Sequence, residues 1–280
     1  MTARPAGPDG AAEGAGPGSD KRILPISYPV RPDPFLVMPP ERGGSEAERA
    51  RYRRRRRRLH RWRRPIVDWH DRLRAWTNML LVDHGFIRAL YPNFWRVTPS
   101  MWRSAQPLPH HIARFARAGG RTVVSLRGGQ AFGSLPLEVE ACERHGLAFH
   151  VIILRSRDLP EVDELIRILD VLARLDRPVL FHCKSGADRA GFMAALWLLV
   201  VEGRPLDEAR AQLSLRYGHF AHAKTGILDA FFEAYARDGG PEAIPFRNWV
   251  ATRYDRAAIR SGFRAGGLHS LLSDRLLGRE

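Results

Sequence analysis

From about residue 94 onward, short apolar runs alternate with longer amphipathic segments. The apolar runs predict a hairpin over residues 95–103 and buried strands over 122–126, 149–154 and 178–181. The amphipathic segments predict helices over 109–118, 137–145 and 160–175, another from about 187 to before 203, and two beginning near 206 and 225. Strands that alternate with helices are typical of an α/β fold. We therefore predict a central, mainly parallel sheet flanked by helices.

The residues before about 94 differ in composition and hydrophobic pattern from the predicted α/β region. Residues 1–20 are rich in Gly, Pro and Ala, and Pro remains frequent to about residue 40, which predicts disorder. The arginine run RYRRRRRRLHRWRRP then covers residues 51–65, and apolar side chains at three- and four-residue spacing over 66–81 predict an amphipathic helix. The predicted organisation is a disordered N-terminus 1–50, a basic helical extension 51–93, a catalytic domain 94–237 and a basic tail 238–280.

Composition indicates which partners and which cellular compartment to expect. A net charge of +15 in 280 residues favours anionic partners. The only two cysteines, Cys142 and Cys183, cannot form the disulfide framework of a small secreted domain or a four-cysteine zinc site, which favours a reducing compartment. The N-terminus lacks the apolar stretch of a secretory signal. We expect a cytoplasmic protein, or one that is peripheral at the inner face of a membrane.

The segment VLFHCKSGADRAG, residues 179–191, carries the candidate chemistry. A buried strand ends at Cys183, glycines punctuate the loop, and an apolar helix follows. A loop that leads into a helix N-terminus points backbone N–H groups at a phosphate, and the same positive end lowers the pKa of a cysteine. Arg189, in the first helical turn, can bind two phosphate oxygens. Gly186 allows the backbone to approach the phosphate closely.

His-Cys, five residues, Arg and then Gly resembles the signature loop of the protein tyrosine and dual-specificity phosphatases. A looser likeness over residues 94–235, including WRSAQP at 102–107, is similar to the compact bacterial and atypical dual-specificity branch. The resemblance implies a nucleophilic Cys183, a phosphate clamp at Arg189 and a cysteinyl-phosphate intermediate, with no metal or other cofactor. It also implies that the remaining loop residues bind the substrate: His182, Lys184, Ser185, Gly186, Ala187 and Asp188.

The family also uses an aspartate to protonate the leaving oxygen. Asp158, in the RSRDLP loop, is the first candidate, Asp188 inside the signature loop is the second, and Asp163, within the helix that follows, is a distant third. After the loop arginine the family commonly has Ser or Thr, whose hydroxyl helps the thiolate to leave, whereas this chain has Ala190. That difference bears on turnover rather than on phosphate binding. Arg127, in LRGG after a strand, is expected either to line the mouth of the site or to serve a turn.

Three functions remain open from the sequence. The resemblance favours a protein tyrosine or dual-specificity phosphatase. Lys184, Asp188 and the basic amphipathic helix favour a lipid phosphatase instead, acting on a phosphatidylglycerophosphate or a phosphoinositide. Ala190 alone favours an inactive phosphate-binding adaptor. The arginine run 51–64 is expected to be solvated or to contact an anionic membrane together with the helix that follows it, whose apolar face is expected to pack on the catalytic body. We do not expect nucleic acid as a partner, because no recognised nucleic-acid motif accompanies the run.

Overall fold

A five-stranded sheet forms the centre of the computed structural model, which describes residues 45–127 and 132–263. The strands are β1 (Trp95–Arg96), β2 (Met101–Ser104), β3 (Thr122–Ser125), β4 (Ala148–Val151) and β5 (Val179–His182). Their order is β1-β2-β5-β3-β4, and only the β1–β2 pair is antiparallel. The predicted α/β architecture with a mainly parallel sheet is confirmed.

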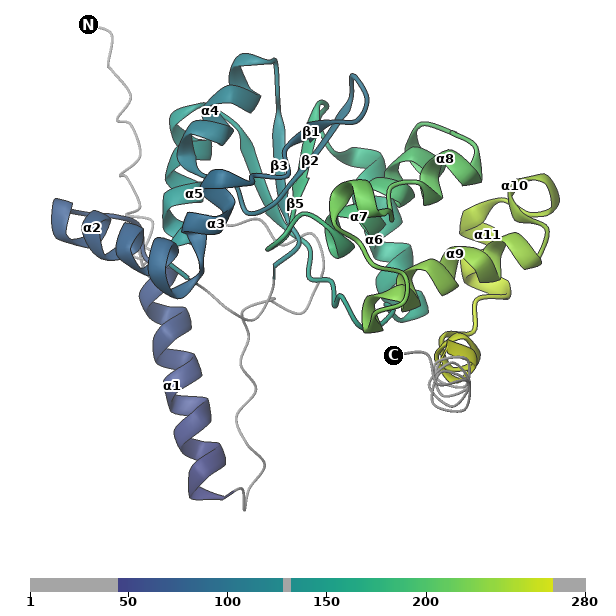
Figure 1. Ribbon diagram of the computed structural model, residues 1–280, viewed down its shortest axis with the longest axis horizontal. Helices are drawn as coiled ribbons and strands as arrows, with labels where there is room; N and C mark the ends of the chain where they lie inside the picture. The colour runs from purple at the N-terminus through teal and green to yellow at the C-terminus, as the bar shows by residue number, and fades with distance from the viewer. Residues whose placement is uncertain (1–44, 128–131, 264–280) are drawn as a thin grey trace, which may run out of the picture.

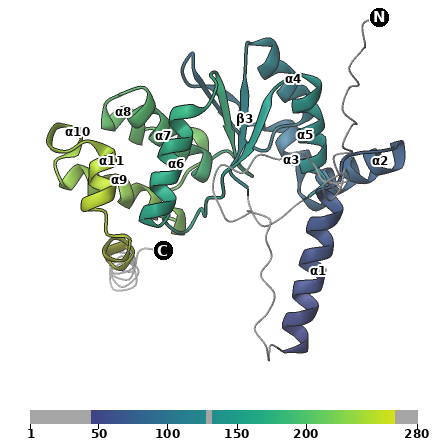
Figure 2. The same cartoon turned by 180° about the vertical axis from the view of Figure 1, so that it is seen from behind.

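Helices cover both faces of this sheet (Figures 1 and 2). One face carries α4 (Pro109–Arg117) and α5 (Ser134–Arg144), and the other carries α6 (Val162–Arg174) and α7 (Asp188–Leu196). The inner strands β3 and β5 are buried at every position, which explains why the sequence there forms apolar runs without alternation, whereas the edge strand β4 alternates. After α7 the chain continues through a π-helical turn, η2 (Trp197–Val201), and then α8 (Leu206–Arg210) and α9 (Ile227–Arg237).

The arginine run is helical. Helix α1 (Glu46–Trp62) begins inside the stretch for which we predicted disorder and continues through the arginines. Ala, Glu and Arg are strong helix formers, so intrinsic propensity outweighs the repulsion between like charges here. Our prediction of disorder up to residue 50 is therefore wrong for residues 46–50, and the rest of it, to residue 44, lies outside the described residues.

The predicted amphipathic helix is present as α2 (Trp69–Thr77), continued by a π-helical turn, η1 (Asn78–Val82), and then by α3 (Gly85–Leu90). Asp68 caps the start of α2 by accepting the Asp71 N–H at 2.7 Å. Ala75 and Met79 are buried against Leu137 of α5, and Trp76 and Leu80 of the predicted apolar face pack beside them. Trp69, Leu73 and Leu81 remain exposed, however, so only part of that face packs on the body.

The chain after residue 237 is not a separate tail. It forms α10 (Gly240–Ala243) and α11 (Phe246–Thr252), and Phe246, Trp249 and Tyr254 are buried in the main core. The aromatic side chains of α11 pack on Phe231 and Tyr235 of α9. These elements were missed because each is short, so hydrophobic periodicity over so few residues carries little signal. The predicted boundary at 237 therefore cuts through one hydrophobic core.

Candidate active site

The signature loop leaves the carboxyl end of β5, which lies between β2 and β3 in the sheet. Cys183 follows β5 directly and is 1% exposed. Its Sγ accepts the Gly186 N–H at 3.3 Å. Gly186 has φ +78°, and a Cβ there would lie 2.5 Å from the Ala105 nitrogen. Glycine is thus required at this position both by conformation and by space.

The carbonyl groups of this loop are bound from outside. The Lys184 carbonyl accepts the Gln106 N–H at 3.3 Å, and the Ser185 carbonyl accepts Asn93 Nδ2 at 3.0 Å. The carbonyls of Gly186 and Ala187 both accept Arg103 Nη2, at 2.7 and 2.9 Å. In a planar trans peptide the C=O and the next N–H point in opposite directions. The following N–H groups are therefore directed toward the concave side of the loop, which makes a cradle for an anion.

Arg103 on β2 is the main support of this cradle. The side chain is fully buried, and Nη1 donates to the Gln212 carbonyl at 2.6 Å. Its guanidinium also lies 3.9 Å from the centroid of the Tyr217 ring. Burial lowers the pKa of Arg103 to about 10. Arg103 belongs to WRSAQP, but no local pattern there indicates that its guanidinium donates to the carbonyls of the loop.

Arg189 lies in the first turn of α7, as expected. Its Nη1 donates to the Leu126 carbonyl at 3.1 Å, at the end of β3. Its Nε is buried and has no hydrogen-bond partner among the described residues. A buried guanidinium N–H without an acceptor is costly, so this donor fits an anion bound in the cradle.

His182 begins a chain of buried polar contacts that we call the His182–Asp83 network. His182 Nε2 lies 2.7 Å from Glu138 Oε1 and both side chains are almost fully buried, but this contact lacks the geometry of a hydrogen bond. Glu138 Oε2 accepts Gln106 Nε2 at 2.7 Å, and Gln106 Oε1 accepts Arg127 Nη1 at 2.8 Å. Arg127 thus connects the surroundings of the loop to Asp83, and the two roles predicted for it stay predictions.

The network ends at Asp83, in the N-terminal extension. Arg127 Nη2 donates to Asp83 Oδ1 at 2.7 Å, and Arg88 Nη2 donates to Oδ2 at 2.8 Å. Burial would raise the pKa of Asp83, but hydrogen bonding and charge from Arg127 outweigh it and lower the pKa below its usual range. The positive charge of exposed Lys184 acts in the same direction. The sequence does not predict the burial of three members of this network, Asp83, Gln106 and Glu138. A single polar residue in the sequence has the same appearance whether it is buried or solvated.

The two candidate acids both have cationic partners. Asp158 Oδ2 lies 2.7 Å from Arg256 Nη2, and Oδ1 lies 3.5 Å from Arg260 Nε. Burial would raise the pKa of Asp158, but the Leu159 N–H and Arg256 lower it below its usual range. Asp158 is therefore a carboxylate in this conformation, so to donate a proton it would first have to leave Arg256.

Asp188, the second candidate, is bound by a histidine. Its Oδ1 lies 2.8 Å from His219 Nδ1, and Nε2 of the same ring lies 2.7 Å from Asp229 Oδ2. Burial would lower the pKa of His219, but the two carboxylates raise it to about 9. A protonated His219 therefore joins the signature loop to α9, a role that its position in the sequence did not reveal.

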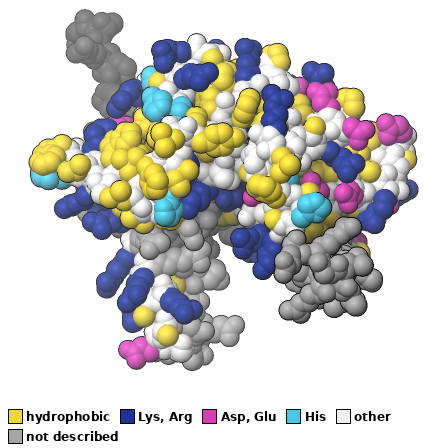
Figure 3. All heavy atoms as spheres, in the orientation of Figure 1, with side chains coloured by type: hydrophobic (Ala, Val, Ile, Leu, Met, Phe, Trp, Pro, Cys, Tyr) yellow, Lys and Arg dark blue, Asp and Glu magenta, His cyan; other side chains and the backbone are white. Residues whose placement is uncertain are grey.

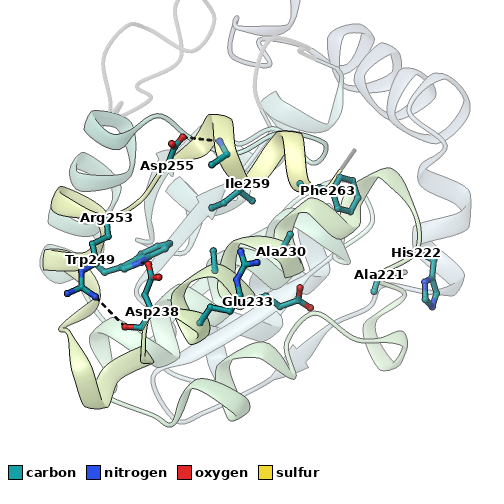
Figure 4. A pocket seen from close by; sticks show the side chains of 14 residues that line it. Ala221, His222, Ala230, Glu233, Asp238, Trp249, Arg253, Asp255, Ile259 and Phe263 are labelled. Atoms are coloured by element: carbon teal, nitrogen blue, oxygen red, sulfur yellow. Dashed lines mark hydrogen bonds between the residues drawn. The ribbon is translucent and has the colours of Figure 1, made fainter. Parts of the chain in front are cut away.

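Other reactive groups lie apart from the loop. Cys142 is buried in α5, and burial raises the pKa of its thiol well above the usual range. Within residues 45–127 and 132–263, no group of His, Cys, Asp and Glu is arranged to hold a metal ion. A cavity of about 870 Å³ lies beside α9 and α11, and none of the predicted site residues lines it (Figure 4). Its wall includes Asp238, whose carboxylate accepts Trp249 Nε1 at 2.6 Å.

Part of this chain is similar in sequence to known phosphatases. Residues 95–227 match the family model described as a "DSP-PTPase phosphatase fused to NAD+ Kinase". These residues therefore resemble a dual-specificity phosphatase domain. The dual specificity protein phosphatase TpbA of Pseudomonas aeruginosa strain PAO1 is 30% identical over 157 residues, which cover 54% of this chain and 65% of the relative.

Among solved structures, the crystal structure of P. aeruginosa TpbA is similar, with 23% identity and a TM-score of 0.43 over 58% of this chain and 92% of the other. The core catalytic domain of the PP-IP phosphatase SIW14 from S. cerevisiae has 17% identity and a TM-score of 0.39 over 52% and 92% of the two chains.

Proposed function

We propose that this phosphatase-family domain hydrolyses phosphomonoesters through a cysteinyl-phosphate, with Cys183 as nucleophile and Arg189 as phosphate clamp. The observation that carries the proposal is the cradle, in which four consecutive loop carbonyls are bound from outside and the loop surrounds a buried thiol. Inward N–H groups stabilise both a bound phosphate and the charge that develops on it during transfer.

In the first step the Cys183 thiolate attacks phosphorus, so that a P–S bond forms and the P–O bond to the leaving group breaks. The leaving oxygen takes a proton from an acid, for which Asp158 remains our first candidate and Asp188 our second. In the second step water attacks the cysteinyl-phosphate and inorganic phosphate leaves. The proton of that water returns to the acid, and the thiolate is regenerated.

The proposed substrate contacts come from the signature loop and the residue at its edge. We propose that the backbone of Ser185, Gly186, Ala187 and Asp188 binds the phosphate, while Lys184 attracts acidic substrates at the mouth. His182, held by Glu138 at 2.7 Å, keeps the loop in place beneath the thiolate. Phosphotyrosine and other protein phosphates are the proposed substrate class, because the curated relative is named a dual specificity protein phosphatase.

Lipid phosphate is the second candidate substrate. It is favoured by the basic helix α1 together with the exposed apolar side chains of α2 and α3. An anionic membrane surface is accordingly a proposed partner of residues 51–64 and of the helix that follows. No helix among the described residues has the length and apolar character needed to span a bilayer.

The proposed reaction is tested by hydrolysis of para-nitrophenyl phosphate with a chelator present. We expect wild type to be active, and Cys183→Ser to lose at least about a thousandfold in kcat because serine is a far weaker nucleophile. Cys142→Ser is the matched control and should keep its activity. If wild type is inactive but still binds vanadate, the adaptor alternative is correct, and recovery of activity by Ala190→Ser would identify the missing hydroxyl as the cause.

A further inference from the structure

Exposed apolar side chains are concentrated in one part of the molecule. Eleven large hydrophobic residues are exposed in the described part of the chain, and nine of them lie between residues 67 and 91. We call these nine the apolar face. Its most exposed members include Trp69, Leu81 and Leu90, and Leu90 is 87% exposed. Single exposed hydrophobic residues are ordinary, whereas a contiguous group of this kind marks a surface that binds a partner.

The apolar face is bordered by positive charge. Figure 3 shows the hydrophobic side chains gathered over α2 and α3, with Lys and Arg side chains along α1 below them. Arg51, Arg53, Arg54 and Arg57 of α1 are all exposed, and none of these four has an ion pair among the described contacts. An apolar surface beside unpaired cations complements the interface of an anionic bilayer, where acyl chains meet negative headgroups.

The same face adjoins the catalytic loop. Leu90 is three residues before Asn93, whose Nδ2 donates to the Ser185 carbonyl at 3.0 Å, so the chain places the two within about 11 Å. Asp83, which follows exposed Val82, ends the His182–Asp83 network. The two remaining exposed hydrophobic residues, Leu215 and Phe220, flank Tyr217, whose carbonyl accepts the same Asn93 amide at 2.9 Å.

From these observations we infer that the apolar face, with the arginines of α1, docks this protein on an anionic membrane and holds the mouth of the signature loop at the bilayer surface. Docking itself does not depend on catalysis. Its consequence, that phosphate groups presented at a membrane are preferred substrates, rests on the proposed function. A second copy of this chain carries a net charge of +15 and would therefore not supply the anionic surface that complements the arginines of α1.

The test is co-sedimentation of the full chain with phosphatidylcholine vesicles, with and without phosphatidylglycerol. Wild type should pellet only with the anionic vesicles. The triple variant Leu81→Gln, Phe86→Gln, Leu90→Gln keeps the net charge, and should bind at least about tenfold more weakly because it loses apolar burial. All three side chains are more than half exposed, so an unchanged thermal melt is expected to confirm that this variant folds.

The charge contribution is tested with two matched variants. Arg53→Gln, Arg54→Gln, Arg57→Gln on α1 should weaken binding roughly a hundredfold, since each cation near an anionic surface contributes about fivefold. Arg167→Gln, Arg174→Gln, Arg237→Gln removes the same charge from α6 and α9, on the other side of the sheet from α1 to α3 (Figure 1), and should bind as wild type does.

The inference is overturned if wild type stays in the supernatant, if the apolar variant binds as wild type does, or if the two arginine variants weaken binding equally. A dimer that the apolar variant converts to a monomer, with no vesicle binding by wild type, would show that the face is a contact between copies. Cys183→Ser should pellet as wild type does. An enzyme that binds anionic vesicles but hydrolyses no aryl phosphate would refute the proposed function and leave docking intact.

Discussion

At the scale of single residues, the carbonyl groups and the N–H groups of the signature loop have different roles. The carbonyls are bound by Arg103, Asn93 and the Gln106 N–H, and this leaves the N–H groups for a ligand. Arg103 can do this only because it is buried among neutral acceptors, with Tyr217 beneath it. The conformation of the cradle is therefore fixed by side chains that never need to touch the phosphate.

The acid is the residue whose role most needs a test. Asp158→Asn should lower kcat on phenyl phosphate by about a hundredfold but lower kcat on an activated nitrophenyl phosphate far less, because a good leaving group needs no proton. Steady-state kinetics with both substrates measure this. Asp188→Asn is the matched variant. A selective loss in Asp188→Asn, with equal losses or none in Asp158→Asn, would transfer the role to Asp188.

At the scale of elements, the N-terminal helices are joined to the signature loop through buried charges. Asp83, directly after η1, binds both Arg88 of α3 and Arg127 after β3. Arg127 then reaches His182 through Gln106 and Glu138. The extension is thus part of the support of the active site, and the surface it presents to solvent lies close to that site.

Removal of the Asp83 charge should show this connection. Asp83→Asn should lower the free energy of unfolding by about 3–5 kcal/mol, because it leaves two buried guanidinium groups without a carboxylate. It should also raise the KM for an aryl phosphate, since Arg127 no longer holds the network in place. Denaturant unfolding and steady-state kinetics measure the two effects.

Arg72→Gln provides the control for this prediction. It breaks the more exposed bridge from α2 to Glu140 of α5 and should cost less than about 1 kcal/mol. It should leave KM unchanged, because Glu140 is outside the network. Equal effects of the two substitutions would mean that the extension only packs on the domain.

At the scale of the whole molecule, the signature loop and the C-terminal helices share one core. Helix α11 packs on α9, and His219 bridges Asp188 at the start of α7 to Asp229 on α9. Because the matched family region ends at residue 227, this C-terminal layer extends the core beyond it.

The His219 bridge predicts a pH-dependent stability. The pKa of His219 rises from 6.5 to about 9 on folding, so its contribution is fully present below pH 6.5 and is lost as the pH rises through 9. Across this interval we expect a loss of roughly 3 kcal/mol in the free energy of unfolding. Urea unfolding at several pH values measures it.

In His219→Gln this slope should flatten, because glutamine takes up no proton. His222→Gln, at an exposed histidine three residues away, should keep the slope of wild type. An unchanged slope in His219→Gln would show that another group titrates in this interval.

The sequence by itself determined the strands, most helices of the body and the signature loop. Each of these depends on neighbours in the chain: burial on both faces makes an apolar run, one buried face makes a helical period, and a strand-loop-helix turn brings Cys183 and Arg189 together within six residues. The helices after residue 237 were not predicted, because each is too short for the hydrophobic periodicity of a helix to be recognised.

Only the tertiary structure decided the partners of the charged groups. Arg103 binds carbonyls more than 80 residues away, Glu138 meets His182, and Arg256 binds Asp158 across 98 residues of sequence. No local pattern encodes such pairs. An Asp or Glu looks the same in the sequence whether it is buried or solvated, and only the fold decides which groups lie beside it. The same holds for the apolar face: periodicity predicted an amphipathic helix over 66–81, but the shape of the domain left much of it uncovered.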